Sequence, residues 1–119
     1  MNFSLSEEQE MLVSTALEIG AEFGPHYWHE QEEKGEFPAA FLKSLADHGF
    51  FSLGISEEYG GLAAGMTEIA LAMEALCRGG AGGGPALGYL FGTLGANIIN
   101  DNASPEQKQR YLPAMAAGE

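Results

Sequence analysis

The glycine run GGAGGG at residues 79–84 is the stretch of this sequence whose composition is closest to that of a phosphate-binding loop. It lacks the Gly-Lys-Ser/Thr ending of a P-loop. Pro85 and Leu87 stand where the third glycine of a Gly-x-Gly-x-x-Gly fingerprint is required, and no strand pattern precedes the run. The sequence therefore predicts a flexible connector between two helices rather than a phosphate cradle.

His26, His29 and Glu30 offer nitrogen and carboxylate groups close together in the chain. Their order is not the His-Glu-x-x-His of a zinc-binding helix, and residues 26–37 are polar and without clear periodicity. This pattern predicts a loop with isolated surface histidines and no metal site. His48 lies at the end of another predicted helix, where its ring can bond a terminal carbonyl.

Two further groups could do chemistry, an acidic pair and a single thiol. Glu57 and Glu58 are adjacent, so a regular element would point them apart, whereas a catalytic carboxylate pair must converge. Cys77 has Arg78 beside it, which could activate the thiol, but a small buried apolar role is the commoner outcome. We therefore predict no catalytic, cofactor-binding or metal-ligating residue in this chain.

The elements that would position these groups are all helical. Ser6 with Gln9, and Ser104 with Gln107, form two capping boxes at predicted helix starts. No segment shows sustained alternation of apolar and polar residues, which argues against strands. The expected helices cover residues 6–24, 38–48, 66–78, 85–98 and 105–113. The prediction is a single all-α domain of four to five helices.

Composition limits the classes of partner and the compartment. The 119 residues carry 17 acids against five Lys and Arg, a net charge of −12. This balance argues against nucleic acid and anionic membranes and is typical of a solvated surface, with a docking face for a basic partner as the alternative. The sequence shows no stretch long enough to span a membrane and no secretory signal at its N-terminus. One cysteine fits a reducing, cytoplasmic location.

Five segments in order resemble the N-terminal domain of the acyl-CoA dehydrogenase family, over nearly the whole chain. They are residues 3–9 (FSLSEEQ), 37–38 with 45–55 (FP and LADHGFFSLGI), 57–61 (EEYGG), 74–76 (EAL), and 107–113 with 117–119 (QKQRYLP and AGE). The resemblance makes FFSLGISEEYGG, residues 50–61, a connector that packs its aromatic residues under the helices. Ser56 stands where the family has proline, which we expect to loosen the turn.

The resemblance implies a fold and an activity. It implies that residues 1–119 are the N-terminal helical domain of a longer chain, with the β-domain and the C-terminal helical domain absent. It implies an FAD-dependent enzyme of fatty acid metabolism that removes the α-proton and the β-hydride of an acyl-CoA thioester. The 119-residue piece is then inactive alone. Implied partners are acyl-CoA, the remaining domains, a homo- or hetero-oligomer, and electron-transfer flavoprotein.

The resemblance also suggests a role for the helix that begins near Pro85, because this helix lines the acyl-chain cavity in the family. By position, the substrate-binding residues would be Leu87, Leu90, Phe91 and Leu94. Three glycines beside them, Gly88, Gly92 and Gly95, would leave room for substrate. The alternative is that the four apolar residues are simply core.

Other functions remain open at this point. An acyl-CoA oxidase or another flavoprotein on the same scaffold would share these segments. A second class of function is a stand-alone helical interaction module, or the non-catalytic half of a heteromeric flavoprotein.

Overall fold

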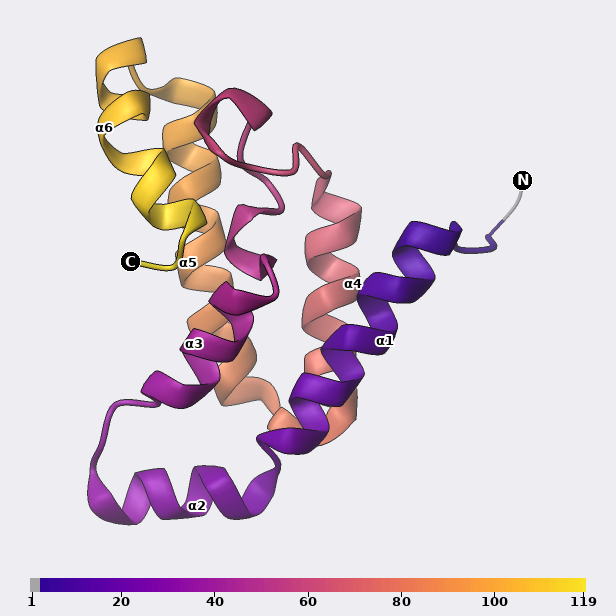
Figure 1. Cartoon of the computed structure of the whole chain (residues 1–119). Helices are drawn as coiled ribbons and strands as arrows, with labels where there is room; N and C mark the ends of the chain where they lie inside the picture. The colour runs from indigo at the N-terminus through magenta and orange to yellow at the C-terminus, as the bar shows by residue number, and fades with distance from the viewer. Residues whose placement is uncertain (1–2) are drawn as a thin grey trace.

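A computed structural model describes residues 3–119, and within this range the chain is helical with no strand (Figure 1). The α-helices are α1 (Glu7–Glu22), α2 (Pro25–Lys34), α3 (Ala39–Asp47), α4 (Met66–Leu76), α5 (Gly83–Asn102) and α6 (Pro105–Ala116). Two 3-10 turns, η1 (Phe50–Ser52) and η2 (Glu57–Tyr59), and a π-helical turn, η3 (Cys77–Ala81), complete the chain. The all-α prediction is confirmed, with six helices in place of four to five.

The two predicted capping boxes are present. At α1 the backbone N–H of Gln9 donates to Ser6 Oγ over 3.2 Å, and the backbone N–H of Ser6 donates to Gln9 Oε1 over 3.0 Å. At α6 the equivalent bonds join Ser104 and Gln107 at 3.3 and 3.0 Å. These local hydrogen bonds satisfy donors that a helix N-terminus otherwise leaves unpaired.

The prediction of a loop over residues 26–37 is wrong, because most of this segment forms α2. The helix has no buried residue, so it shows no apolar stripe for sequence analysis to detect. Instead Trp28 holds it: the indole N–H donates to the carbonyl of Phe23 at the end of α1, over 2.6 Å. The Trp28 ring also packs edge-on against Phe41 of α3, with centroids 5.0 Å apart. Tertiary contacts have overridden a weak local signal.

The two histidines of α2 lie on its exposed side. His26 and His29 each face a glutamate one turn on, Glu30 at 3.6 Å and Glu33 at 3.5 Å. Such exposed pairs at i, i+4 contribute little to stability. Among residues 3–119 no group of three or more His, Cys, Asp or Glu is placed to hold a metal ion.

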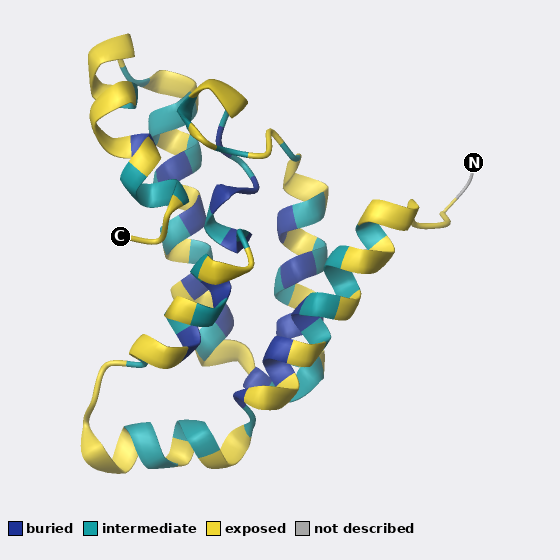
Figure 2. Cartoon of the chain, in the orientation of Figure 1, coloured by how far each residue is buried: buried dark blue, intermediate teal, exposed yellow. Residues whose placement is uncertain are grey.

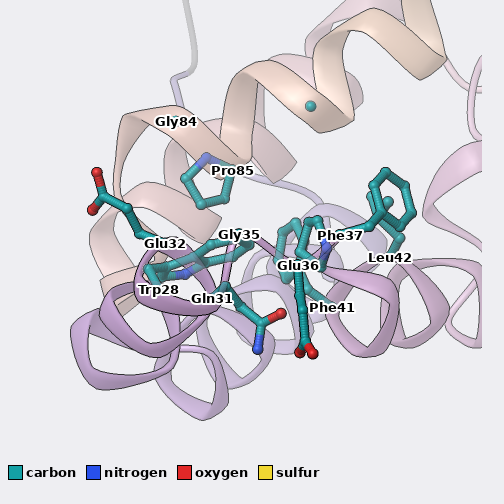
Figure 3. A pocket seen from close by; sticks show the side chains of 12 residues that line it. Trp28, Gln31, Glu32, Gly35, Glu36, Phe37, Phe41, Leu42, Gly84 and Pro85 are labelled. Atoms are coloured by element: carbon teal, nitrogen blue, oxygen red, sulfur yellow. The ribbon is translucent and has the colours of Figure 1, made fainter.

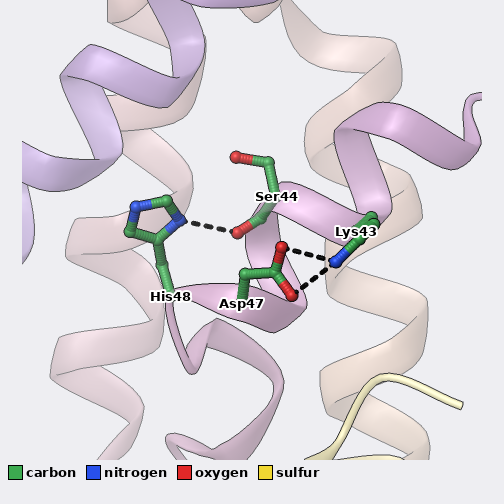
Figure 4. A network of polar contacts seen from close by, with 4 residues as sticks. All are labelled: Lys43, Ser44, Asp47 and His48. Atoms are coloured by element: carbon green, nitrogen blue, oxygen red, sulfur yellow. Dashed lines mark hydrogen bonds and ion pairs between the residues drawn. The ribbon is translucent and has the colours of Figure 1, made fainter.

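The end of α3 is organised by short-range polar contacts (Figure 4). His48 Nδ1 lies 2.8 Å from the carbonyl oxygen of Ser44, which confirms the predicted bond to a terminal carbonyl. Lys43 donates to both carboxylate oxygens of Asp47, at 2.8 and 2.7 Å. At the other end, Pro38 was predicted to be the first residue of the helix. It is instead the N-cap, so α3 begins one residue later, at Ala39.

The main core lies among α1, α3, α4, η1 and α5, and Figure 2 shows its buried residues on the facing sides of these elements. Its largest fully buried side chains are Tyr89, Phe41, Phe50, Leu45, Ile69 and Leu76. A smaller core of Ile55, Ala96 and Leu112 joins the connector to α5 and α6. The Cα atoms extend over 42 × 41 × 19 Å, so the domain is a flat slab.

The glycine run is not the flexible connector that its composition predicts. Helix α4 ends at Leu76, short of the predicted Arg78, and the chain continues as the π-helical turn η3 packed against α1. A Cβ on Gly79 would lie 2.5 Å from the carbonyl oxygen of Leu17, and one on Gly20 would lie 2.5 Å from that of Leu76. The glycines let the two backbones touch. The last two glycines of the run open α5.

The segment FFSLGISEEYGG is the predicted connector, and Phe50 is buried against Tyr89 with ring centroids 6.2 Å apart. The expectation that Ser56 loosens the turn is wrong. The backbone N–H and the hydroxyl of Ser56 both donate to Asn100 Oδ1, at 3.0 and 2.8 Å. A proline has no N–H and could not make the first bond, so Ser56 ties the turn to α5.

Candidate functional site

Helix α5 has an inner face that belongs to the core. Its buried residues are Ala86, Tyr89, Thr93 and Ala96. The hydroxyl of Tyr89 donates to the carbonyl of Phe50 over 3.1 Å, and burial raises the pKa of this phenol. Tyr89 is therefore neutral and serves as a structural anchor between α5 and the connector.

The outer face of α5 carries an uncovered apolar stripe at helical spacing. Leu87, Phe91, Leu94 and Ile98 are 51%, 70%, 42% and 55% exposed. Single exposed apolar residues are ordinary, but four of them aligned at one-turn spacing along a helix are typical of an interaction surface. We call these four residues the α5 stripe.

Three of the four residues predicted to bind substrate belong to the α5 stripe. Leu87, Phe91 and Leu94 are exposed and Leu90 is half-buried on the flank of the stripe. The alternative that all four are core is therefore wrong for three of them within this domain. Their contact with substrate stays a prediction.

A groove runs along one flank of the stripe, between the α2–α3 corner and the N-terminal half of α5 (Figure 3). Its volume is about 630 Å³, within the range of small-molecule sites. The lining residues are Trp28, Gln31, Glu32, Gly35, Glu36, Phe37, Pro38, Phe41, Leu42, Gly84, Pro85 and Gly88. A second hollow of about 210 Å³ follows, and it shares Leu42 and Gly88 with the first.

The glycines of α5 differ in the space they leave. A Cβ on Gly84 or Gly88 would meet nothing within 4 Å. A Cβ on Gly92 would lie 3.0 Å from Phe51 Cε1, and one on Gly95 would lie 3.6 Å from Met115 Cε. Of the three glycines predicted to leave room for a ligand, only Gly88 opens onto empty space.

The remaining chemical candidates are spread over the surface. Glu57 and Glu58 are exposed on η2, as predicted for a solvated turn. Cys77 is half-buried rather than buried, with its Sγ 3.5 Å from the carbonyl oxygen of Gly82. None of these groups faces the groove, whose lining is mostly apolar and aromatic, so the arrangement is suited to binding apolar groups.

Sequence reasoning missed the groove altogether. Trp28, Phe37 and Phe41 form its aromatic wall, and they come together only because α2 exists and folds back against α3. The signals that could have found α2 are Pro25 as a first helical residue and Gly35 as a left-handed terminator, with φ of 63°.

Comparisons with known proteins place the chain in a family. The family model described as "Acyl-CoA dehydrogenase, N-terminal domain" matches residues 6–119. The probable acyl-CoA dehydrogenase YngJ of Bacillus subtilis is 34% identical, over 99% of this chain and 31% of its own length. A short-chain specific acyl-CoA dehydrogenase of Clostridium acetobutylicum is 30% identical, over 100% and 31%. The chain thus spans about a third of these relatives.

Two solved structures share the fold. A chain from the structure described as the electron transferring flavoprotein of Acidaminococcus fermentans superposes with a TM-score of 0.84 at 27% identity. A chain from "PigA with FAD and proline" superposes with a TM-score of 0.85 at 23% identity. Each match covers 99% of this chain and 31% of the other. On the family match over residues 6–119, this chain belongs to the acyl-CoA dehydrogenase family and corresponds to its N-terminal domain.

Proposed function

We propose that residues 1–119 are the helical N-terminal domain of an FAD-dependent enzyme that dehydrogenates an acyl-CoA thioester at its α and β carbons. In this proposal the β-domain and the C-terminal helical domain belong to the same enzyme but lie outside these residues. The domain alone is inactive. The relatives that are named acyl-CoA dehydrogenases support this reading of the whole enzyme.

The observation that carries a role for this domain is the α5 stripe. Leu87, Phe91 and Leu94 project from a helix whose other face is locked into the core by Tyr89. A rigid helix with an apolar outer face is suited to form one wall of a cavity for a hydrocarbon chain. We propose that these three residues, with Leu90 at the flank, contact the acyl chain.

We propose that the flavin is held mainly by parts of the enzyme outside the described residues. The part of the glycine run within η3 packs against α1 instead of surrounding a cavity, and the groove beside α5 offers carboxylates where a pyrophosphate needs donors. When bound, FAD supplies the hydride acceptor, and its contacts come mainly from other parts of the enzyme.

The test measures kcat/KM of the native enzyme for acyl-CoA substrates of increasing length, with a bulkier residue on the stripe. Leu87→Trp adds volume at a residue that is 51% exposed, so we expect this domain to fold as before. We expect selectivity to move toward shorter acyl chains by about tenfold, the scale of one or two methylenes in an apolar pocket. Gly92→Phe would be a poorer test, since it would displace Phe51.

The matched control is Leu62→Trp, which makes the same change at a residue that is 59% exposed and lies in the loop before α4. This variant should leave the order of substrates unchanged. Identical chain-length profiles for both variants would show that the stripe does not touch the acyl chain. An enzyme with no flavin absorbance and no activity on any acyl-CoA would refute the wider proposal.

The partners and the location of the enzyme stay predictions. We propose electron-transfer flavoprotein as the electron acceptor and a homo- or hetero-oligomeric state, both from the family. No helix among residues 3–119 is long and apolar enough to cross a membrane. The cytoplasmic location rests on the single cysteine of the sequence.

A further inference from the structure

We propose that the groove between α2, α3 and α5 is a docking site for a separate protein, which inserts an amphipathic helix carrying Lys or Arg beside its apolar face. The groove is not the surface proposed above for the acyl chain. Only Gly84, Pro85 and Gly88 of α5 line it, and no residue of the α5 stripe does. The two proposals can therefore fail independently.

The first argument is the aromatic wall. Trp28 and Phe41 lie side by side below Pro85, and Phe37 stands at the edge of the groove (Figure 3). Phe37 is 74% exposed and lies in the short loop between α2 and α3. Aromatic residues in an open hollow are the usual anchoring surface for apolar side chains of a protein partner.

The second argument is the bare backbone of α5. Gly84 and Gly88 are one helical turn apart, and a Cβ on either would meet nothing within 4 Å. Side chains of an approaching helix can therefore pack directly on the α5 backbone. Apolar walls with close access to the backbone fit recognition of a helix in a groove.

The third argument is the charge of the lining. Glu32 and Glu36 line the groove, and no Lys, Arg or His does among residues 3–119. A basic residue beside the apolar face of a partner helix would complement this charge. The same carboxylates disfavour the phosphates of CoA. They also disfavour a second copy of this chain, whose net charge is −12.

The fluorescence of a single tryptophan can report binding in the groove. Trp28 is the only tryptophan of the 119 residues and it lines the groove, so its emission reports occupancy. We would titrate the 119-residue chain with a Leu/Lys amphipathic peptide of about 14 residues, long enough to form a helix on binding. A Leu/Glu peptide of the same pattern is the counterpart. Calorimetry on the native polypeptide gives the affinities independently of the Trp28 signal.

We expect the Leu/Lys peptide to shift Trp28 emission to shorter wavelength and the Leu/Glu peptide to leave it unchanged. Filling the groove with Gly88→Leu, or removing its edge with Phe37→Ala, should weaken binding by about tenfold or more, as for anchor positions of interfaces. Neither change is expected to disturb folding, since Gly88 faces open space and Phe37 is exposed.

Two matched double variants distinguish specific binding in the groove from non-specific attraction of a basic peptide to an acidic protein. Glu32→Gln with Glu36→Gln removes two charges at the groove, and Glu7→Gln with Glu8→Gln removes two from the exposed first turn of α1. The first pair should weaken the Leu/Lys peptide by about tenfold and the second by less than about twofold. Equal losses in both pairs, equal binding of both peptides, or no binding to the native polypeptide would each overturn the proposal.

Discussion

The glycines of η3 and those at the start of α5 come from one run in the sequence and lie in opposite environments. Gly79 in η3 faces the α1 backbone so closely that a methyl group there would reach 2.5 Å from the carbonyl oxygen of Leu17. Gly84 of the same run, and Gly88 one helical turn beyond it in α5, face empty space on the groove side. The same residue type thus brings two backbones together in one region and keeps a surface open in the other.

A similar contrast separates the two faces of α5. Tyr89 is fully buried and hydrogen-bonded, whereas Phe91, two residues on, is 70% exposed. This difference shows that the two faces of α5 have different roles. Its inner face completes the core of this domain, and its outer face is a surface available to something else. The predictions below test this division, starting from the largest expected effect.

Truncating the two aromatics of α5 should separate the faces most clearly. Tyr89→Ala removes a fully buried ring and leaves the carbonyl of Phe50 without its donor, so we expect a loss of about 3–5 kcal/mol in the free energy of unfolding. Phe91→Ala should change it by no more than roughly 0.5 kcal/mol. Urea unfolding of the 119-residue chain measures both, and comparable losses would mean that Phe91 is also core.

Adding one methyl group at two glycines tests the other contrast. Gly79→Ala forces a Cβ against backbone atoms of α1 that cannot turn away, and we expect a loss of about 1–3 kcal/mol, the usual cost of overpacking. Gly88→Ala places the same methyl group in open space on a helix, so helix propensity should make it more stable by roughly 1 kcal/mol. Thermal melts of the two variants should therefore shift in opposite directions, and shifts of the same sign would refute the contrast.

These contrasts also explain how far the sequence predicts the fold. Helices α1 and α6 are predictable because Ser6 and Ser104 form their caps within one turn of chain. Helix α2 is harder to predict: Pro25 and Gly35 mark its ends, but contacts of Trp28 with Phe23 and Phe41 stabilise it instead of an apolar stripe. The packing of η3 is not predictable, since the partner of Gly79 lies on α1, far away in the sequence.

The exposed face of α5 was predictable only in part. The family resemblance selects Leu87, Leu90, Phe91 and Leu94 on this helix. The structure exposes three of them and leaves Leu90 half-buried, and their contact with substrate stays a prediction. The groove was missed together with α2, because Trp28 of α2 forms part of its aromatic wall. The roles of the glycines could not be predicted: Gly92 meets Phe51, a residue from a connector whose path the sequence leaves open.

A smaller effect is expected where the connector is tied to the inner side of α5. Asn100→Ala removes the acceptor for the backbone N–H and the hydroxyl of Ser56, so we expect a loss of about 1–2 kcal/mol in the free energy of unfolding. Asn102→Ala is the control, since Asn102 bonds only within α5, to the carbonyl of Ile98. Equal stability of both variants in urea would show that the turn holds without Asn100.

The smallest effect concerns the α1–α4 pair at the N-terminal ends of its helices, far from the η3 glycines. Glu68 accepts hydrogen bonds from the side chain of Gln9 at 2.7 Å and from the backbone N–H of Gly65 at 2.8 Å. The bond from Gln9, with backbone donors, lowers the pKa of Glu68 below its ordinary value of 4.5. A lowered pKa in the folded state means that the charged form stabilises the fold. This contribution is complete above pH 4.5 and is lost as the pH falls through the folded pKa.

Melting temperatures of the wild-type chain and of Glu68→Gln measure this contribution as the pH falls below about 4.5. The glutamine keeps an oxygen that can accept, but it cannot titrate, so the melting temperature of the variant should fall less steeply with pH. The other acids titrate alike in both proteins, and the difference between the two curves isolates Glu68. Parallel curves would show that Gln9 and Gly65 bond the neutral acid as well as the carboxylate. The α1–α4 pair would then be held by its apolar core and the glycine contact at η3, with no charge-dependent contribution from this end.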